Sequence, residues 1–166
     1  MKKYLLRCTL LFITALQLFS CKGVDQSTAE QRTPLDLAEV DALVSSFPIQ
    51  DPTLNIVFDD SSFADVSSSG TGTLGKCLIE TNTITIDERF WVGSTRLVKE
   101  SLLYHEMAHC LLGIGHHSMT IMDSFIGYGA KMYKANGLSE LGSLPCDTGC
   151  DLPRIQNNRA SFNANF

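Results

Sequence analysis

Histidine is scarce in this chain of 166 residues: there are only four, and all of them lie between His105 and His117. Positive charge is also short, with 13 Lys and Arg against 18 Asp and Glu. This deficit argues against a nucleic-acid-binding protein and against electrostatic adhesion to an anionic membrane. The concentration of histidine in one short window instead indicates a metal site there.

A long apolar run is missing as well. Residues 10–18 are apolar but too few to span a bilayer, and three basic residues precede them, which is typical of an export signal over residues 1–20. Residues 18–21 (LFSC) resemble a bacterial lipobox, which implies cleavage before Cys21 and lipidation of that cysteine. The alternative is an ordinary secretory signal cleaved nearby, and both interpretations place the protein outside the cytoplasm.

The rest of the chain divides into a linker and one domain. Residues 21–34 are polar and aperiodic, which predicts a flexible tether. Residues 35–166 have the length of a single domain, and cleavage after residue 20 would leave 10 Lys and Arg against 18 Asp and Glu. We expect a monomeric, acidic domain that only the lipid holds at a bacterial membrane, on its periplasmic or cell-surface face.

Four cysteines lie in the predicted domain, and an oxidising compartment would allow them to pair. Three pairings are possible. We favour Cys77–Cys110, which would tie a strand to a helix, and Cys146–Cys150, which would close a small loop. The alternative for Cys110 is a zinc ligand, but this residue adjoins His109 and therefore points about 100° away from it on a helix.

Apolar periodicity predicts the first elements of the domain. Residues 34–47 carry one apolar stripe, which predicts a helix that begins near Pro34 and ends before Pro48. Three short β-rich runs follow at residues 54–59, 76–80 and 83–87. The last two should form a hairpin with Asn82 in its turn, because asparagine tolerates a positive φ.

A longer helix is predicted from about Thr95 to Leu112, with its apolar stripe continued by two histidines. Trp91 is interpreted as a core anchor between this helix and the sheet. Residues 131–141 suggest another short helix interrupted at Gly137, and residues 142–166 give little indication of structure. The expected fold is α+β, with a small twisted sheet packed on an N-terminal helix and on the histidine helix.

Residues 105–109 (HEMAH) have the pattern HExxH. On a helix, His105 and His109 lie on one face one turn apart, so they can bind one zinc ion, with Glu106 as the general base. A single histidine on an apolar helix face is usually an ordinary core residue. Two at this spacing, with glutamate between them and two more histidines beyond a glycine, favour zinc binding.

A catalytic zinc site needs a third protein ligand and an open position for water. His116 is the nearest candidate, because Gly113 ends the helix and lets the chain turn back. His117 competes with it, since neighbouring side chains of an extended segment point in opposite directions. Glu140 is a second alternative, but its sequence surroundings are not typical of a buried, metal-facing helix.

With this motif the chain resembles the metzincin zinc peptidases, in which a glycine and a third histidine follow HExxH. The family has five residues between the second and third histidines, whereas this chain has six, and Leu112 stands at the glycine position. Cys77, Asp87 and residues 90–91 (FW) also resemble the arrangement in small, matrixin-like bacterial lipoproteins. The resemblance covers about residues 75–125.

The resemblance implies a metzincin-like fold with a methionine turn beneath the zinc ion. Met122 suits that role, and Met119 is the alternative. It also implies that an extended substrate adds to the edge strand at residues 76–80. Residues 123–134 would then form the wall of the pocket for the side chain after the cleaved bond.

The expected function is a zinc endopeptidase that cleaves peptide or protein substrates with a zinc-activated water and Glu106 as general base. The alternative is a non-enzymatic, zinc-binding surface lipoprotein that keeps the zincin fold. Glu106 favours the enzyme, because a purely structural zinc site does not need a general base. Zinc-dependent hydrolysis of another amide, such as one in the cell wall, is a third possibility.

Overall fold

The computed structural model describes residues 35–60, residue 63 and residues 73–166, all of which belong to the compact unit Thr33–Phe166. The expectations for residues 1–34, including the export signal, the tether and lipidation of Cys21, lie outside the described residues. Within the described ranges, no helix is long and apolar enough to cross a membrane.

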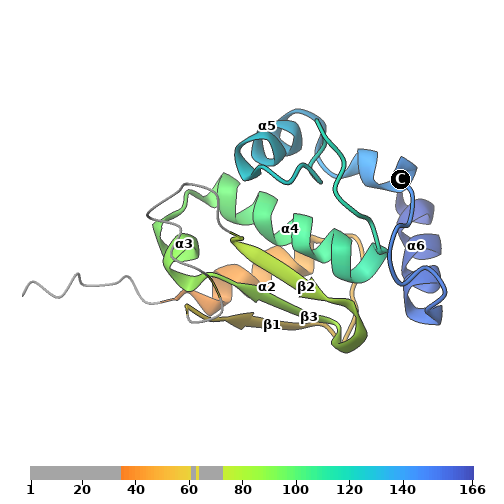
Figure 1. Cartoon of the computed structure of the whole chain (residues 1–166), viewed down its shortest axis with the longest axis horizontal. Helices are drawn as coiled ribbons and strands as arrows, with labels where there is room; N and C mark the ends of the chain where they lie inside the picture. Colours follow the sequence, from red (N-terminus) through yellow and green to blue (C-terminus); the bar gives the residue numbers. More distant parts are fainter. Residues whose placement is uncertain (1–34, 61–62, 64–72) are drawn as a thin grey trace, which may run out of the picture. The chain divides into compact units, whose positions relative to one another are not determined.

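The described chain forms a three-stranded mixed sheet with the strand order β1-β3-β2 (Figure 1). The strands are β1 (Asn55–Phe58), β2 (Gly75–Leu78) and β3 (Thr83–Ile86). The central strand β3 is parallel to β1 and antiparallel to β2. Ile84 and Ile86 are fully buried, so β3 provides the core side chains of the sheet.

The turn between β2 and β3 differs from the predicted hairpin. β2 ends at Leu78, and Ile79–Thr81 form a short 3-10 helix, η3, so the strand predicted over residues 76–80 began one residue late and ended two residues late. Asn82 follows with a φ of 50°, the left-handed conformation expected for it. The strand predicted over residues 83–87 ended one residue late, because Asp87 caps the next helix and does not continue β3.

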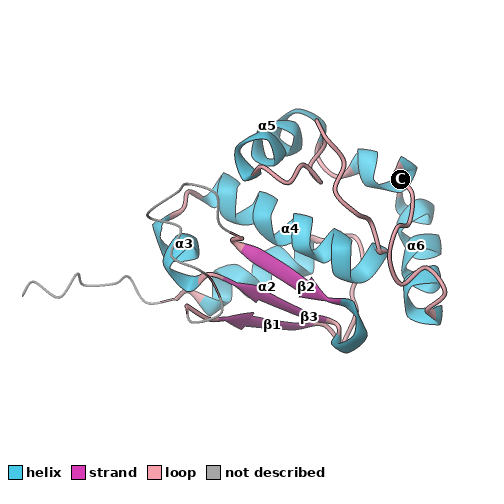
Figure 2. Cartoon of the chain, in the orientation of Figure 1, coloured by secondary structure: helices cyan, strands magenta, loops and turns pink. Residues whose placement is uncertain are grey.

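The helix α4 (Arg96–Leu112) is the central element of the fold. It contacts β2, β3, α2, α5 and α6, and Figure 2 shows the sheet on one side of it and α5 on the other. Most of its second half is buried. Gly113 ends the helix with a φ of 66°, and its N–H donates to the last turn, as the sequence predicted.

Two shorter helices pack beside the sheet and α4. The first, α2 (Leu37–Ser46), begins later than predicted because Asp36 caps it by accepting a hydrogen bond from the N–H of Glu39. The second, α3 (Glu88–Gly93), was not predicted and is capped by Asp87. It carries Trp91, which is 1% exposed and packs edge-on against Phe58, in agreement with its interpretation as a core anchor.

The C-terminal helices differ from the sequence-based expectation. α5 spans Ile126–Asn136 and ends at Gly137, whose φ is 63°, so the helix predicted over residues 131–141 was wrong at both ends. A 3-10 helix, η4 (Ser139–Ser143), follows. α6 (Pro153–Asn165) was missed because it is strongly polar, with Ile155 and Phe162 as its buried side chains. The described fold is therefore α+β, with five α-helices and a small mixed sheet.

Candidate metal centre

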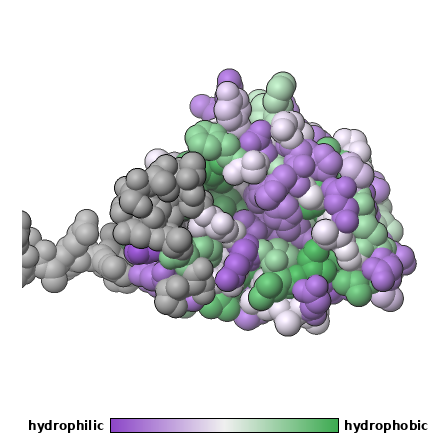
Figure 3. All heavy atoms as spheres, viewed as in Figure 1, coloured by the Kyte–Doolittle hydropathy of each residue, from purple (hydrophilic) through white to green (hydrophobic). Residues whose placement is uncertain are grey.

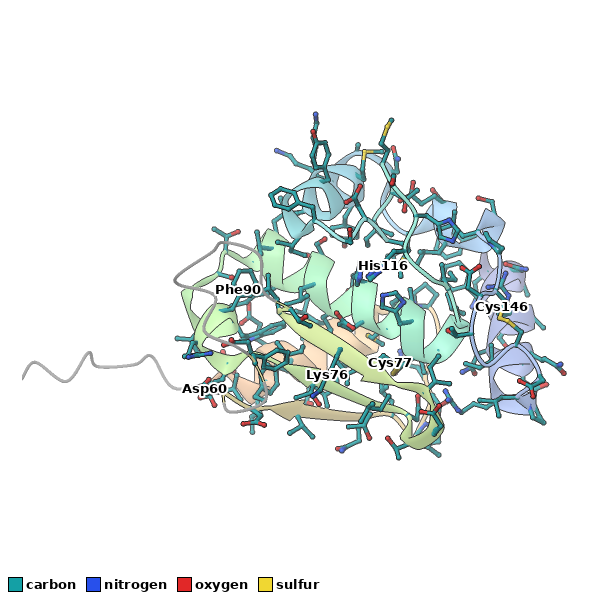
Figure 4. All side chains as sticks on the ribbon, viewed as in Figure 1. Asp60, Lys76, Cys77, Phe90, His116 and Cys146 are labelled. Carbon is teal, nitrogen blue, oxygen red and sulfur yellow. A yellow bond between two sulfur atoms is a disulfide. The ribbon has the colours of Figure 1, made fainter. Side chains whose placement is uncertain are left out.

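Three of the four histidines converge above α4. One ring nitrogen from each of His105, His109 and His116 lies within 4.8 Å of the others. The Nε2 atoms of His105 and His109 are 3.0 Å apart, and the His116 ring is centred 5.2 Å and 4.8 Å from the rings of His105 and His109. Figure 4 shows His116 over α4. The arrangement brings together the histidine set predicted to bind the metal.

The two helix histidines are held by backbone carbonyl groups through their Nδ1 atoms. His105 Nδ1 lies 2.9 Å from the carbonyl oxygen of Ile121, and His109 Nδ1 lies 2.5 Å from that of Ile114. A carbonyl can only accept, so each Nδ1 carries the hydrogen and each Nε2 of the neutral rings has a lone pair. Two lone pairs that face each other at 3.0 Å are favourable when a cation lies between them, which fits a metal centre.

Electrostatics favours the neutral, metal-binding form of these rings. Burial, followed by the neighbouring His109 imidazole, lowers the pKa of His105 to about 4. Burial also lowers the pKa of His109, although the hydrogen bond to Ile114 acts in the opposite direction. Because a metal ligand must be deprotonated at the coordinating nitrogen, both rings are ready to bind a metal at neutral pH.

The side chain of Glu106 is buried beside the edge strand β2. Its side chain is 4% exposed, and Oε2 has no hydrogen-bond partner among the described residues. Burial raises the pKa of Glu106 to about 8. A Cβ atom added at Gly75 would lie 2.6 Å from Glu106 Oε1, so only glycine leaves room for the carboxyl group beside β2. A cation at the neighbouring histidines would favour the charged carboxylate.

His117, the competing third ligand, points away from the other three histidines. Its Nε2 lies 3.1 Å from Asp147 Oδ2, and its backbone N–H donates to the carbonyl oxygen of Met122. Of the two adjacent histidines, His116 is therefore the one that belongs to the cluster. His116 is also the most exposed of the three, as expected for a side of the site that meets solvent.

The methionine turn candidates behave differently. Met122 is completely buried, whereas Met119 is 68% exposed. Glu140, the other alternative ligand, does not belong to the cluster. Its Oε1 accepts a hydrogen bond of 2.6 Å from the N–H of Ile121, the residue whose carbonyl group holds His105. Glu140 therefore supports the loop under the site, a role that the sequence did not indicate.

Both disulfides of the structure have the favoured pairing, Cys77–Cys110 and Cys146–Cys150. The first joins β2 to α4, so Cys110 is not a free thiolate that could bind a metal. The second closes a loop beside the residues that follow α4. In Figure 4, Cys77 lies at the sheet and Cys146 lies near α6.

The surroundings of the histidines offer an open surface. Figure 3 shows hydrophilic residues gathered in the middle of this face, over the second half of α4. β2 lies at the edge of the sheet, and residues 123–134 include the exposed side chains of Phe125 and Tyr128, whose rings lie 5.9 Å apart. A pocket among Trp91, Arg96 and Lys99 lies at the start of α4 and does not involve the histidines.

Sequence reasoning missed the residues that support this site. Asp147 accepts hydrogen bonds from Gly115 and His117, and in the sequence it stands only within the small loop that the Cys146–Cys150 pairing would close. Its position between two close cysteines was the one available indication that this segment is held rigidly. Comparison of the chain with protein-family models, with curated proteins and with solved structures found no match.

Proposed function

We propose that the protein is a zinc-dependent endopeptidase of the metzincin-like type. The observation that supports this best is the buried, unpartnered carboxylate oxygen of Glu106 on the helix that also carries two of three converging imidazoles. A purely structural metal site would not require such a group, because an unpaired buried carboxyl is costly to the fold. Its presence on this helix fits a site that is organised for proton transfer.

His105, His109 and His116 would hold the metal ion, and an all-imidazole set is suited to zinc. A zinc ion bound there would supply Lewis-acid chemistry, which makes water nucleophilic near neutral pH. The carbonyl groups of Ile114 and Ile121 fix the two helix imidazoles with Nε2 directed into the site.

Glu106 is the residue of this chain that would move protons. Oε2 has no partner of its own, so it can accept a proton from water and deliver it to the departing amine. Gly75 admits the carboxyl group beside the edge strand β2. An extended peptide that adds to β2 would then lie next to this carboxyl group, with its backbone satisfied by strand pairing.

The full chain, exported by a bacterial host, provides the test. We expect about one zinc ion per chain by elemental analysis, cleavage of a peptide library at internal bonds, loss of cleavage after treatment with a chelator, and recovery with zinc. Cleavage that persists in the metal-free protein would refute the proposal. Bound zinc without any cleavage would instead indicate the non-enzymatic, zinc-binding surface lipoprotein.

The cellular location is part of the same proposal. Two disulfides agree with an oxidising compartment, and residues 18–21 would direct lipid to Cys21. Substitution of Cys21→Ala should release the protein from the membrane fraction of such a host. Membrane association that is unchanged in this variant would contradict the lipid anchor.

A further inference from the structure

The disulfide-closed loop Cys146–Cys150 is fitted closely to the turn after α4. The carbonyl oxygen of Gly113 accepts hydrogen bonds from the N–H groups of Asp147, at 2.8 Å, and Thr148, at 3.1 Å. A Cβ atom at Gly113 would lie 2.3 Å from the Thr148 carbonyl oxygen and 2.9 Å from Cys146 Sγ. The two segments therefore meet at a distance that excludes any side chain at Gly113.

The carboxylate of Asp147 reaches further, to both sides of the third histidine. Its Oδ2 accepts a hydrogen bond of 2.8 Å from the N–H of Gly115 and lies 3.1 Å from His117 Nε2. These two residues are the immediate neighbours of His116 in the chain. One carboxylate oxygen thus fixes the chain before and after this ligand.

His116 lacks the support that the other two histidines have. His105 and His109 are carried by a buried helix, and each has its Nδ1 against a carbonyl group. His116 is exposed, and its ring makes no hydrogen bond among the residues that the structure describes. Its position depends on the path of the backbone through residues 113–117, which is the path that Asp147 restrains.

We propose that Asp147, presented by the Cys146–Cys150 loop, is a positioning residue that holds His116 in place as the third metal ligand. The proposal rests on the metal site described under the proposed function. The turn between His109 and His116 has six residues, so it has many conformations in which the third imidazole would miss the site. The two hydrogen bonds to Asp147 remove many of these conformations before the metal binds, which lowers the entropic cost of binding.

The test is the zinc affinity of the full chain, measured by competition with a chromophoric chelator. Loss of a residue that orients a metal ligand typically weakens affinity by about 10–100-fold, and we expect this range for Asp147→Ala. Asp147→Asn should recover most of the affinity, because its amide oxygen can still accept from Gly115 and His117. Asp151→Ala is the matched control, since Asp151 is exposed one residue beyond the disulfide.

A second background separates positioning from general stability. In a chain that already carries His116→Ala, the Asp147→Ala substitution should change zinc affinity by less than about twofold, because the ligand it positions is gone. Thiol titration and circular dichroism of each variant verify that both disulfides and the fold are intact. A cobalt-substituted Asp147→Ala protein should also show an altered visible spectrum relative to the parent.

If the parent protein binds zinc, two results would overturn the proposal: unchanged zinc affinity in Asp147→Ala, or an equal loss in the parent and in the His116→Ala background. Neither depends on peptidase activity. If the parent protein binds zinc tightly but cleaves nothing, the enzyme proposal fails and the role of Asp147 is still measured. If the parent protein does not bind zinc, the metal site itself is wrong, and the proposal for Asp147 fails with it.

Discussion

Helix α4 and the loop that follows it, residues 113–123, both carry groups of the candidate metal centre, yet they are held by different forces. α4 is anchored by its buried residues, which include His105 and Glu106, and by the disulfide from Cys110 to β2. Helical geometry puts its two histidines on one face, one turn apart, and the carbonyl groups of Ile121 and Ile114 then orient their rings. The spacing of the two histidines is therefore determined within a few residues of sequence.

The loop is held by polar contacts from segments that follow it in the chain. Glu140 holds Ile121, whose carbonyl group in turn contacts His105, and Asp147 holds the residues on either side of His116. The loop also has buried side chains at Ile114, Ile121 and Met122, but His116 itself is exposed. One half of this candidate site is thus fixed mainly by local structure, and the other half by hydrogen bonds between segments that are distant in sequence.

The largest expected effect is on catalysis, from substitution of Glu106 on helix α4. Glu106→Gln should lower kcat/KM by about 10²–10⁴-fold, because removal of a general base has an effect of this size. Zinc content should stay the same, since Glu106 is not a member of the histidine cluster. Glu80→Gln, at an exposed position, serves as the control. Activity that survives in Glu106→Gln would assign proton transfer to a group outside α4.

The two disulfides allow helix α4 to be compared with the Cys146–Cys150 loop, which supports residues 113–117. Cys77 and Cys110 are 33 residues apart, and Cys146 and Cys150 are four apart. Chain entropy predicts that replacing the first pair with serine costs about 4 kcal/mol of unfolding free energy, against about 2 kcal/mol for the second. Denaturant unfolding of both double variants measures the difference. An equal cost would mean that the Cys146–Cys150 disulfide contributes as much to the unfolding free energy as the Cys77–Cys110 disulfide does.

Gly75 tests how tightly β2 encloses the helix carboxylate. In Gly75→Ala the new methyl group would press on Glu106 Oε1, and overpacking of this kind costs about 1–3 kcal/mol. We expect a lower unfolding free energy and a lower kcat/KM, because the carboxyl group must move. Gly93→Ala is the matched control, since a Cβ atom there would meet nothing within 4 Å. Equal unfolding free energies and equal kcat/KM values in the two variants would show that the Glu106 carboxyl group can move without cost.

The smallest effect is expected for Glu140 in the support of the loop. Glu140→Ala removes the acceptor for the N–H of Ile121, so the carbonyl group that holds His105 becomes less well fixed. Zinc affinity should fall by about tenfold. Glu140→Gln should lose less, because its amide oxygen can still accept that hydrogen bond. If Glu140→Ala binds zinc as tightly as the parent, the helix positions His105 without help from the loop.

The sequence predicted well those features that short-range rules determine. The central helix, its end at Gly113 and the left-handed Asn82 follow from periodicity and from the conformational preferences of glycine and asparagine. The convergence of His105 and His109 follows from a spacing of four residues. The structure also brings His116, and not His117, into the cluster; His116 was favoured as the histidine nearest to the helix end at Gly113.

Features that depend on distant contacts could not be predicted in this way. α6 has two buried apolar side chains in 13 residues, and its guanidinium groups bind backbone carbonyls instead: Arg154 contacts Cys110, and Arg159 contacts Leu112. The apolar residues of such a helix are too few to give a periodic pattern that would predict it. The register of α5 was misread for a related reason, because the strongest local marker, Gly137, ends that helix and does not interrupt it.

The elements on the two sides of the candidate metal centre, β2 and α5, are joined to α4 in different ways. On one side, a covalent bond prevents the edge strand from moving away from the helix that carries the histidines. On the other side, α5 is joined to α4 by packing and by contacts such as the hydrogen bond from Tyr133 to Glu100. In Figure 1, β2 and α5 lie on opposite sides of α4. The distance between β2 and α4 is therefore fixed by covalent bonds, whereas the distance between α5 and α4 depends on noncovalent packing.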